Sequence, residues 1–231
     1  MKRSRRYEQA VAMVEREKKY APLEAIELMK QMATAKFPET ADAAYSLGVN
    51  PSQYMIRGTC ALPHGTGKEV RVLVFAKGEK IREAEEAGAD YVGGEELAER
   101  IQKEGWLEFD RVVASPDMMP VVGRLGKILG PRGLMPSPKT DTVTQEVGRL
   151  VQELKAGMIE FRTDRTGIVH AAFGKVTFEV EQLEENLLAL TKAILERRPE
   201  GFKGRYVKGV SISSTLSPGI TVDHAALISA A

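Results

Sequence analysis

The chain has 231 residues, which is long enough for two domains, and its 43% hydrophobic and 28% charged residues are ordinary for a folded globular protein. The net charge of +1 carries no information about a partner, and the single cysteine excludes an internal disulfide framework and a cysteine-rich zinc site. No apolar run is long enough to span a bilayer and the basic start is not followed by a signal-peptide pattern, so we expect a soluble cytoplasmic protein.

The first segment of the chain, up to about His64, predicts two helices and then a strand. Residues 7–20 have the pattern of a short amphipathic helix. Pro22 suits the first turn of a second helix, over 22–32, whose apolar residues recur at helical spacing. Residues 34–49 read as a strand because alternation replaces the helical period.

The middle of the chain, from Lys68, alternates short β-branched runs with helical patterns. Such alternation is typical of a doubly wound, parallel α/β unit. Several of its helices are expected to end at a glycine, as Gly88 illustrates. The strands are expected at 70–75, 89–93 and 109–115, and the helices at 80–88, 95–105, 116–129 and 144–157.

The last part of the chain returns to the character of the first. Residues 158–173 predict two strands with a turn at 164–167, residues 182–195 an amphipathic helix, and residues 205–215 a final alternating strand. We therefore predict a mixed α/β protein of two domains. A discontinuous α+β outer domain (1–67 plus 159–231) would hold an inserted, Rossmann-like, three-layer α/β domain (68–158).

The charge distribution agrees with this division. The outer segments carry slightly more cations than acids, the inner segment slightly more acids than cations, and residues 79–110 are strongly acidic. Both predicted crossings between the domains contain glycine beside a cation. Glycine tolerates unusual backbone angles, so Gly65, Gly67 and Gly157 are hinge candidates, although two ordinary turns explain them equally well.

The segment from Val121 to Lys139 suggests an anion-binding loop because it combines glycines and cations with no acid. A phosphate loop for a nucleoside triphosphate needs a glycine, four residues, then Gly-Lys-Ser/Thr, and neither this segment nor residues 64–69 has that pattern. A dinucleotide fingerprint also fails. We expect no cofactor here, and a cytosolic nucleotide-binding α/β enzyme remains the alternative function.

The sequence also lacks clear catalytic and metal-binding motifs. The three histidines are far apart in the sequence and lack ligand spacing, so we expect no metal site. Cys60 lies in an apolar stretch and is expected to be a small core residue. Asp90, Asp110 and Asp117 fall near ends of predicted parallel strands, where α/β enzymes often place chemistry, but helix capping explains Asp117 equally well.

Two short stretches of the outer domain suggest nucleic acid. Lys36 and Phe37 place a cation beside an aromatic ring, so one can meet a phosphate while the other packs on a sugar or base. Phe37 could instead belong to the core. Ser213, Ser214 and Thr215 are three consecutive hydroxyls at a predicted strand end, where they could bond 2′-hydroxyls or phosphates.

Taken together, these segments resemble the ribosomal protein L1 family in its bacterial form, the proteins of the mobile stalk of the large ribosomal subunit. The resemblance covers about Tyr7 to Asp223 and is carried by TAKFPET, LGVNP, RGTCALPHGTGK, SPDMMPVVGRLGKILGPRGLMPSPKTDTV and VSISSTLSPGITVD. It implies two domains, the outer one discontinuous, joined by a hinge. It also implies a non-enzymatic protein of the cytoplasmic ribosome that binds large-subunit ribosomal RNA, contacts exit-site transfer RNA to assist its release, and represses translation of its own operon messenger RNA.

The resemblance also implies which residues contact RNA. They come from the first segment, the second strand pair and the last strand with its turn: Lys36, Phe37, Thr40, Arg165, His170, Ser211, Ser213, Thr215, Leu216, Ser217 and Gly219. The family usually has Thr-Met-Gly where this chain has Thr215, Leu216 and Ser217. The Cβ of Ser217 puts close RNA approach there in doubt, and the segment after Pro51 is expected to be a trimmed loop.

The glycine-rich inner segment is expected to make a secondary RNA contact by charge and shape. Gly130 and Gly133 should form a rigid turn after a helix that ends near Leu129. The alternative is that the loop only packs the inner domain. The cations expected on this surface are Arg124, Lys127, Arg132 and Lys139.

Overall fold

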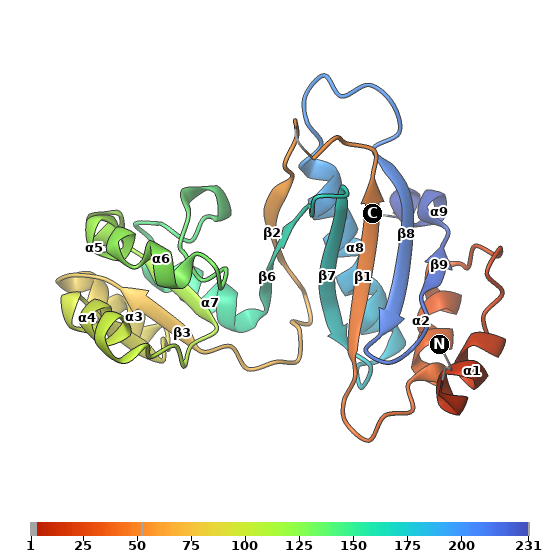
Figure 1. The fold of residues 1–231 in the computed structure, drawn as a ribbon, viewed down its shortest axis with the longest axis horizontal. Coiled ribbons are helices and arrows are strands. Elements are labelled where there is room, and N and C mark those ends of the chain that lie inside the picture. Colours follow the sequence, from red (N-terminus) through yellow and green to blue (C-terminus); the bar gives the residue numbers. More distant parts are fainter. Residues whose placement is uncertain (1–3, 52, 231) are drawn as a thin grey trace. The chain divides into compact units, whose positions relative to one another are not determined.

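The computed structural model describes residues 4–51 and 53–230, and it has the mixed α/β fold expected from the sequence (Figure 1). The chain folds into two compact units. The outer unit contains the described residues up to Gly67 and those from Ile159 onward, and the inner unit is Lys68–Met158. Within the described residues, no helix is both long and apolar enough to cross a membrane.

The outer unit is built on a four-stranded sheet with the strand order β7-β1-β8-β9. Strand β1 from the first segment lies between β7 and β8 from the last one and pairs antiparallel with both, and β9 pairs antiparallel with β8. The strands are β1 (Thr40–Leu47), β7 (Ile168–Lys175), β8 (Val207–Ser214) and β9 (Ile220–Val222). The sheet therefore forms only when both ends of the chain contribute.

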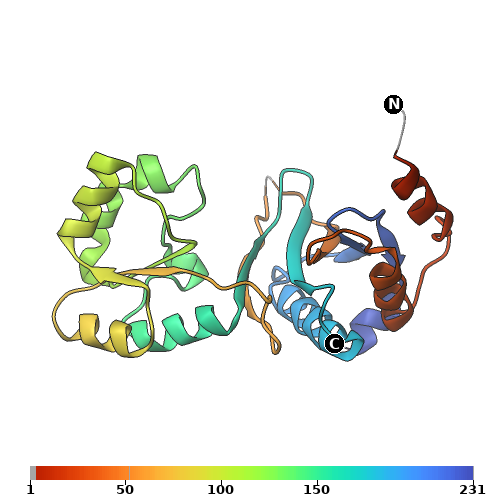
Figure 2. The same cartoon turned by 90° about the horizontal axis from the view of Figure 1, so that it is seen from below.

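Alternation along the strands gives this sheet one buried and one open face. In β1, Ala41, Ala43, Tyr45 and Leu47 are buried, while the residues between them are not. The buried face packs on α2 (Pro22–Met32) and α8 (Val180–Glu196) in a single core. In Figure 2, α8 lies below the sheet and α1 (Arg5–Ala12) lies above it, on the other side. Away from the β9 edge, where α1 lies, the open face is thus available to a partner.

Residues 158–173 contain two strands with a turn at 164–167, as predicted, and an antiparallel bridge joins Thr163 to Val169 beside this turn. The sequence did not indicate their partners: β6 (Met158–Arg162) pairs with β2 (Arg57–Ala61) in a separate two-stranded sheet, while β7 joins the large one. One prediction about the outer strands needs correction, because the strand at 205–215 is followed by β9 and by α9 (His224–Ala230) and is not the last element. Cys60, on β2, is buried as expected, and its burial raises the pKa of the thiol to about 11.

The inner unit has a parallel sheet with the order β4-β3-β5 between two layers of helices. Leu73 and Phe75 of the central strand pack on one layer, and Val72 and Val74 pack on the other. Such a strand is buried on both sides, which is why it reads as a continuous apolar run. The strands are β3 (Val72–Phe75), β4 (Tyr91–Gly93) and β5 (Arg111–Ala114), and the longer helices are α3 (Glu79–Glu86), α4 (Glu95–Glu104) and α7 (Val147–Ala156).

The single helix predicted over 116–129 is divided into three short pieces. These are the 3₁₀ turn η1 (Pro116–Met118), α5 (Met119–Arg124) and α6 (Gly126–Leu129). Glycines at 123 and 126 favour the breaks because glycine weakens a helix interior. After α6 the chain turns as expected: Gly133 has a φ of 70°, and its N–H donates to Gly130 O.

Candidate functional site

The open face of the outer sheet carries small and polar side chains. Asp42 lies directly opposite Ser213 of β8, and Ala44 lies between Ser211 of β8 and His170 of β7. Directly paired residues project to the same face of a sheet, so these side chains form one continuous surface. From Thr40 to Ser46 this surface extends for about 20 Å along the strand. Between Thr40 and Ala44 its side chains on β1 are small or polar, which lets another backbone approach closely.

One end of the open face is fastened by a buried carboxylate. Glu39, only 3% exposed, lies just before β1 and accepts hydrogen bonds from Ser214 Oγ (2.7 Å), Leu216 N (3.0 Å) and Ala35 N (3.0 Å). It therefore joins the loop before β1 to the turn after β8, although they lie far apart in the sequence. Burial acts to raise the pKa of Glu39, but these hydrogen bonds more than offset it and leave the pKa below its usual value.

The two loops that Glu39 joins present exposed apolar side chains beside hydroxyl groups. Phe37 is 51% exposed and Leu216 is 40% exposed, so Phe37 is not a core residue. Thr215 Oγ1 accepts a hydrogen bond from Thr40 N at 3.0 Å, which leaves its hydroxyl proton available to an external acceptor. Lys36 is exposed on the same loop as Phe37. The structure thus brings Lys36, Phe37, Thr40, Thr215 and Leu216 to one end of the sheet.

Ser217 has an internal role in the turn after β8. Its Oγ accepts a hydrogen bond from Ser214 N at 2.8 Å, and its own N–H donates to Ser214 O. A serine therefore closes this turn, which offers a physical reason for a serine where the resembling family has glycine. Gly219, further along the turn, is exposed, and a Cβ added there would meet no protein atom within 4 Å. Nothing within the described protein requires a glycine at 219.

Arginines gather at the opposite end of β7, beside the turn that precedes it. Arg165 lines a cavity of about 380 Å³ together with Arg57 and Arg162. Arg57 donates to Met55 Sδ, at 2.7 Å from Nη2. Asp164 shapes the turn by accepting from Thr166 N and Ile168 N, and its Oδ2 lies 3.9 Å from His170 Nε2. Arg165 is therefore separated from Thr215 by the length of the sheet.

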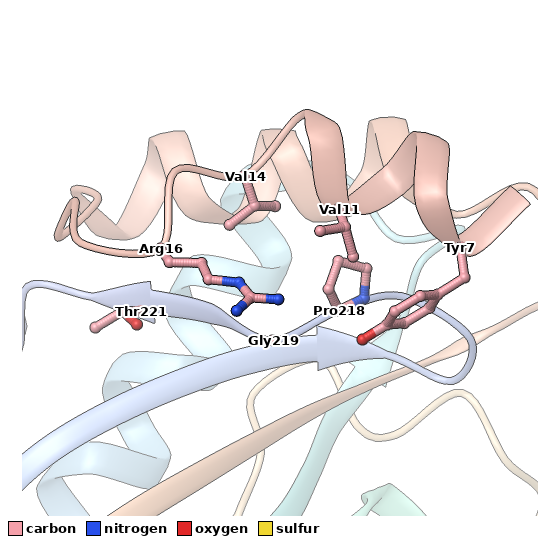
Figure 3. A pocket seen from close by; sticks show the side chains of 7 residues that line it. All are labelled: Tyr7, Val11, Val14, Arg16, Pro218, Gly219 and Thr221. Atoms are coloured by element: carbon pink, nitrogen blue, oxygen red, sulfur yellow. The ribbon is translucent and has the colours of Figure 1, made fainter. Parts of the chain in front are cut away.

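A second cavity lies between α1 and the turn after β8, above the β9 edge of the open face (Figure 3). Its volume is about 260 Å³, and its lining includes Tyr7 of α1 and Pro218 of the turn. Neither residue, nor Arg16 beside them, was among the candidates from sequence. Helix α1 and the turn after β8 are far apart in the sequence and meet only in the folded protein. A pattern within a short stretch of sequence therefore could not predict this contact.

The inner unit presents exposed cations as expected. Arg124, Lys127 and Arg132 are exposed, and none has an ion pair with another residue in the described part of the chain. The side chain of Lys139 lies outside the described part. These cations come from α5, from α6 and from the turn that follows it.

The three glycines proposed as hinges have left-handed backbone angles: φ is 64° at Gly65, 68° at Gly67 and 109° at Gly157. Such angles strain any residue with a Cβ, so each position favours glycine for local reasons. At Gly67 a Cβ would also come within 3.0 Å of Phe178 ring atoms. A hinge function for them stays a prediction.

The acidic candidates for enzyme chemistry have structural partners. Asp90 and Asp110 precede their strands, and so they lie at the edge opposite to the carboxyl ends where α/β enzymes bind ligands. Asp90 accepts from Val72 N, Asp110 binds Lys68 and Arg71, and Asp117 pairs with Lys80. Over residues 4–51 and 53–230, no cluster of three His, Cys, Asp or Glu side chains could hold a metal ion.

A comparison with protein families agrees with the resemblance noted from the sequence. Residues 29–218 match the model described as the ribosomal protein L1p/L10e family. The match runs from α2 through the whole inner unit to the turn after β8, and so it includes the loop of Phe37, the Glu39 contacts and Thr215.

Proposed function

The chain belongs to the ribosomal protein L1p/L10e family, structural proteins that bind ribosomal RNA in the large subunit, and on this premise we propose that the open face of the outer unit is its RNA-binding surface. The family is non-enzymatic and places the protein on the ribosome in the cytoplasm. The observation that carries the proposal is the 20-Å polar face, which ends at Phe37, Thr215 and Leu216, all held in place by Glu39.

The chemistry of this face suits RNA. A-form RNA has a wide, shallow minor groove lined with 2′-hydroxyls, and proteins recognise it by shape and by hydrogen bonds. Ser211, Ser213 and Thr215 supply hydroxyls that can donate and accept, while the exposed ring of Phe37 can pack on a sugar or base. Lys36 at one end and Arg165 at the other can meet phosphates where the backbone leaves the face.

We further propose that the protein occupies the mobile stalk of the subunit, assists release of deacylated transfer RNA from the exit site and represses translation of its own operon messenger RNA. Repression follows if the messenger folds into the shape that the open face binds in ribosomal RNA. One face cannot hold both RNAs, so they should compete for it. A messenger fragment that binds without displacing the ribosomal RNA fragment would contradict this part of the proposal.

Substitutions on the open face test the main proposal. Ser213→Gln places a longer side chain on the face, opposite Asp42, and should weaken binding to a stalk fragment of ribosomal RNA. Lys192→Gln, on α8, is a matched control because it lies on the helix-covered side. Crosslinking with both partners mapped should connect the RNA to β1, β7 and β8. Unchanged affinity with Ser213→Gln, together with crosslinks elsewhere, would reject the open face.

The inner cations are proposed as a secondary RNA contact made by charge. Replacing both Arg124 and Arg132 with glutamine should reduce the salt dependence of RNA binding by at most about two counterions. Discrimination between RNA sequences should stay the same, because phosphate contacts carry no sequence information. A changed sequence preference with an unchanged salt slope would contradict this role.

A further inference from the structure

The cavity beneath α1 has two walls of different origin. Tyr7 and Val11 project from α1, and Figure 3 shows both pointing down toward Pro218 in the turn after β8. Val14 and Arg16 follow the helix and complete the upper wall. The side of the tyrosine ring, the proline ring and the two valines supply the apolar part of the lining of this slot, and Arg16 and Thr221 supply polar groups.

Arg16 adds a charge to this slot. Its guanidinium extends over the strand toward the cavity in Figure 3, and it forms no hydrogen bond or ion pair with any other residue that the structure describes. A guanidinium can donate several hydrogen bonds in one plane, and it stacks well on flat π-systems. The slot therefore combines apolar side chains with a cation that has no hydrogen-bond or ion-pair partner in the described part of the chain.

We propose that this cavity receives one unpaired base of the RNA that lies on the open face, a proposal that rests on the function proposed above. Its volume of about 260 Å³ is near the lower end of ligand pockets, roughly 300–1,000 Å³, so it suits a single flat ring system. RNA is read most specifically through unstacked bases inserted against aromatic side chains and arginine. Here Tyr7 and Arg16 supply both groups.

The position of the cavity favours RNA as its occupant because the cavity is continuous with the open face. Thr221 lines the cavity and lies directly opposite Ser211, at the centre of that face. Gly219 lies between them and Thr215, and the space where its Cβ would project is empty of protein. An RNA strand that contacts Thr215 could therefore pass over Gly219 and place its next unpaired base in the cavity.

Filling the cavity tests the proposal directly. Val11→Trp should occupy the slot and weaken binding of the full-length protein to a stalk fragment of ribosomal RNA by roughly 5- to 150-fold, the usual value of one stacked base. Ala12→Trp is the matched control, since Ala12 is exposed on the same helix and does not line the cavity. It should bind as the unsubstituted protein does. Equal affinity of all three proteins would overturn the proposal.

A second measurement identifies which base enters the cavity. It remains informative even if Val11→Trp does not fold. Each unpaired base of the RNA fragment is replaced in turn by an abasic site, and affinity is measured with the unsubstituted protein, Val11→Trp and Tyr7→Ala. At one position, the abasic site should weaken binding to the unsubstituted protein. The same abasic site should leave the affinities of Val11→Trp and Tyr7→Ala unchanged, because these variants have already lost the contact with that base. Tyr7→Phe, which keeps the ring, should behave as the unsubstituted protein does.

The outcomes separate the two proposals. If the unsubstituted protein fails to bind the fragment, the proposed RNA face is wrong. If it binds and responds to Ser213→Gln, but every abasic effect is the same with Val11→Trp and Tyr7→Ala, the face is retained and the base pocket is rejected. A loss of affinity with Val11→Trp that couples to no abasic position also rejects the base pocket, because the substitution would then act by moving α1.

Discussion

At the scale of single residues, Glu39 is an acid within a surface proposed to bind a polyanion. Its charge does not face that surface, because three donors from the two flanking loops surround the carboxylate. The carboxylate thereby positions Phe37 and Thr215, and we regard it as a positioning residue.

Glu39→Gln tests this positioning role. The amide keeps the shape of the side chain but turns an NH₂ group toward a backbone or hydroxyl donor, and each unsatisfied buried donor costs about 1–3 kcal/mol. We expect a lower melting temperature and weaker RNA binding together. Glu200→Gln, at an exposed position, should change neither. Unchanged RNA affinity with Glu39→Gln would show that the loops hold their arrangement without the carboxylate.

Thr215 has both an internal and an external role. Because its hydroxyl already accepts from Thr40 N, Thr215→Val should lower stability slightly and should also weaken RNA binding by about 0.5–1.5 kcal/mol. Thr215→Ser keeps the hydroxyl and is the matched control. Titrations at fixed salt and melting curves separate the two effects. An affinity unchanged by Thr215→Val removes this hydroxyl from the interface.

His224 should make stability depend on pH. Burial lowers the pKa of this histidine, and Arg205 and Lys19 lower it further against the opposing effect of Asp223. The unfolded chain therefore binds the proton more readily, so stability falls as pH decreases through the ordinary histidine value of about 6.5. We expect melting temperature to fall between about pH 7.5 and 5.5, above the range where carboxylates titrate.

His224→Gln should flatten this pH dependence, whereas His170→Gln, at an exposed position, should leave it in place. Melting curves at matched ionic strength give the comparison. If the two variants show the same slope as the unsubstituted protein, His224 is not the group responsible.

At the scale of elements, one buried side chain fastens α8 to two other segments. Asn186 Nδ2 donates to Gly65 O at 3.0 Å and Phe173 O at 2.9 Å, and its Oδ1 accepts from His64 N at 3.0 Å. The carbonyl of a proposed hinge residue, Gly65, is thus held by the helix. Asn186 is fully buried, so bulk water does not reach its side chain.

Asn186→Leu should lower the free energy of unfolding by at least about 2 kcal/mol, because it strands several buried backbone groups at once. Amide hydrogens near Gly65 should exchange faster. Leu190→Met is a control on the same helix, since swaps that conserve volume usually cost less than about 1.5 kcal/mol. Urea unfolding and hydrogen exchange measure the two effects. If the two variants lose similar amounts of unfolding free energy, the hydrogen bonds of Asn186 contribute no more to stability than ordinary core packing does.

How much the sequence predicts also differs from element to element. The inner strands were predictable because a strand buried on both sides is a continuous apolar run, as in β3. The helix over 116–129 was predicted as one piece because its apolar periodicity outweighed the glycines that break it. The separation of β6 from β7 was missed, since strand pairing across the chain leaves no local pattern.

The same limit applies to the candidate site. Phe37 and Thr215 were reachable through short motifs, whereas Glu39 was missed, because its burial depends on partners around position 215. The cavity beneath α1 was missed for the same reason. Contacts between distant segments decide both features, and a pattern within a short window cannot carry that information.

At the scale of the whole molecule, the two units have separate hydrophobic cores. The outer core contains only residues up to Leu62 and from Ile159, and the two inner clusters contain only residues between Val70 and Met158. Each unit therefore has the apolar interior that an independently folding domain needs.

Residues 1–67 joined to 159–231 through a short flexible linker should therefore fold and keep most of the RNA affinity. A cooperative melting transition and a titration with the stalk RNA fragment give the two measurements. The inner segment 68–158 alone is the comparison, and it should bind RNA weakly and without sequence preference. A folded outer unit that binds about tenfold more weakly than the whole chain, or worse, would show that the interface extends beyond it.

The placement of β1 between β7 and β8 also has a consequence for synthesis of the protein. A ribosome makes β1 early, then the complete inner unit, and only afterwards the two strands that flank β1. Domains fold largely in the order in which they emerge, so the inner unit can fold while β1 still lacks both of its neighbours. A nascent or prematurely terminated chain therefore has no assembled open face. If this face represses translation by binding messenger RNA, only chains that have been synthesised at least to the end of β8 can act as repressors.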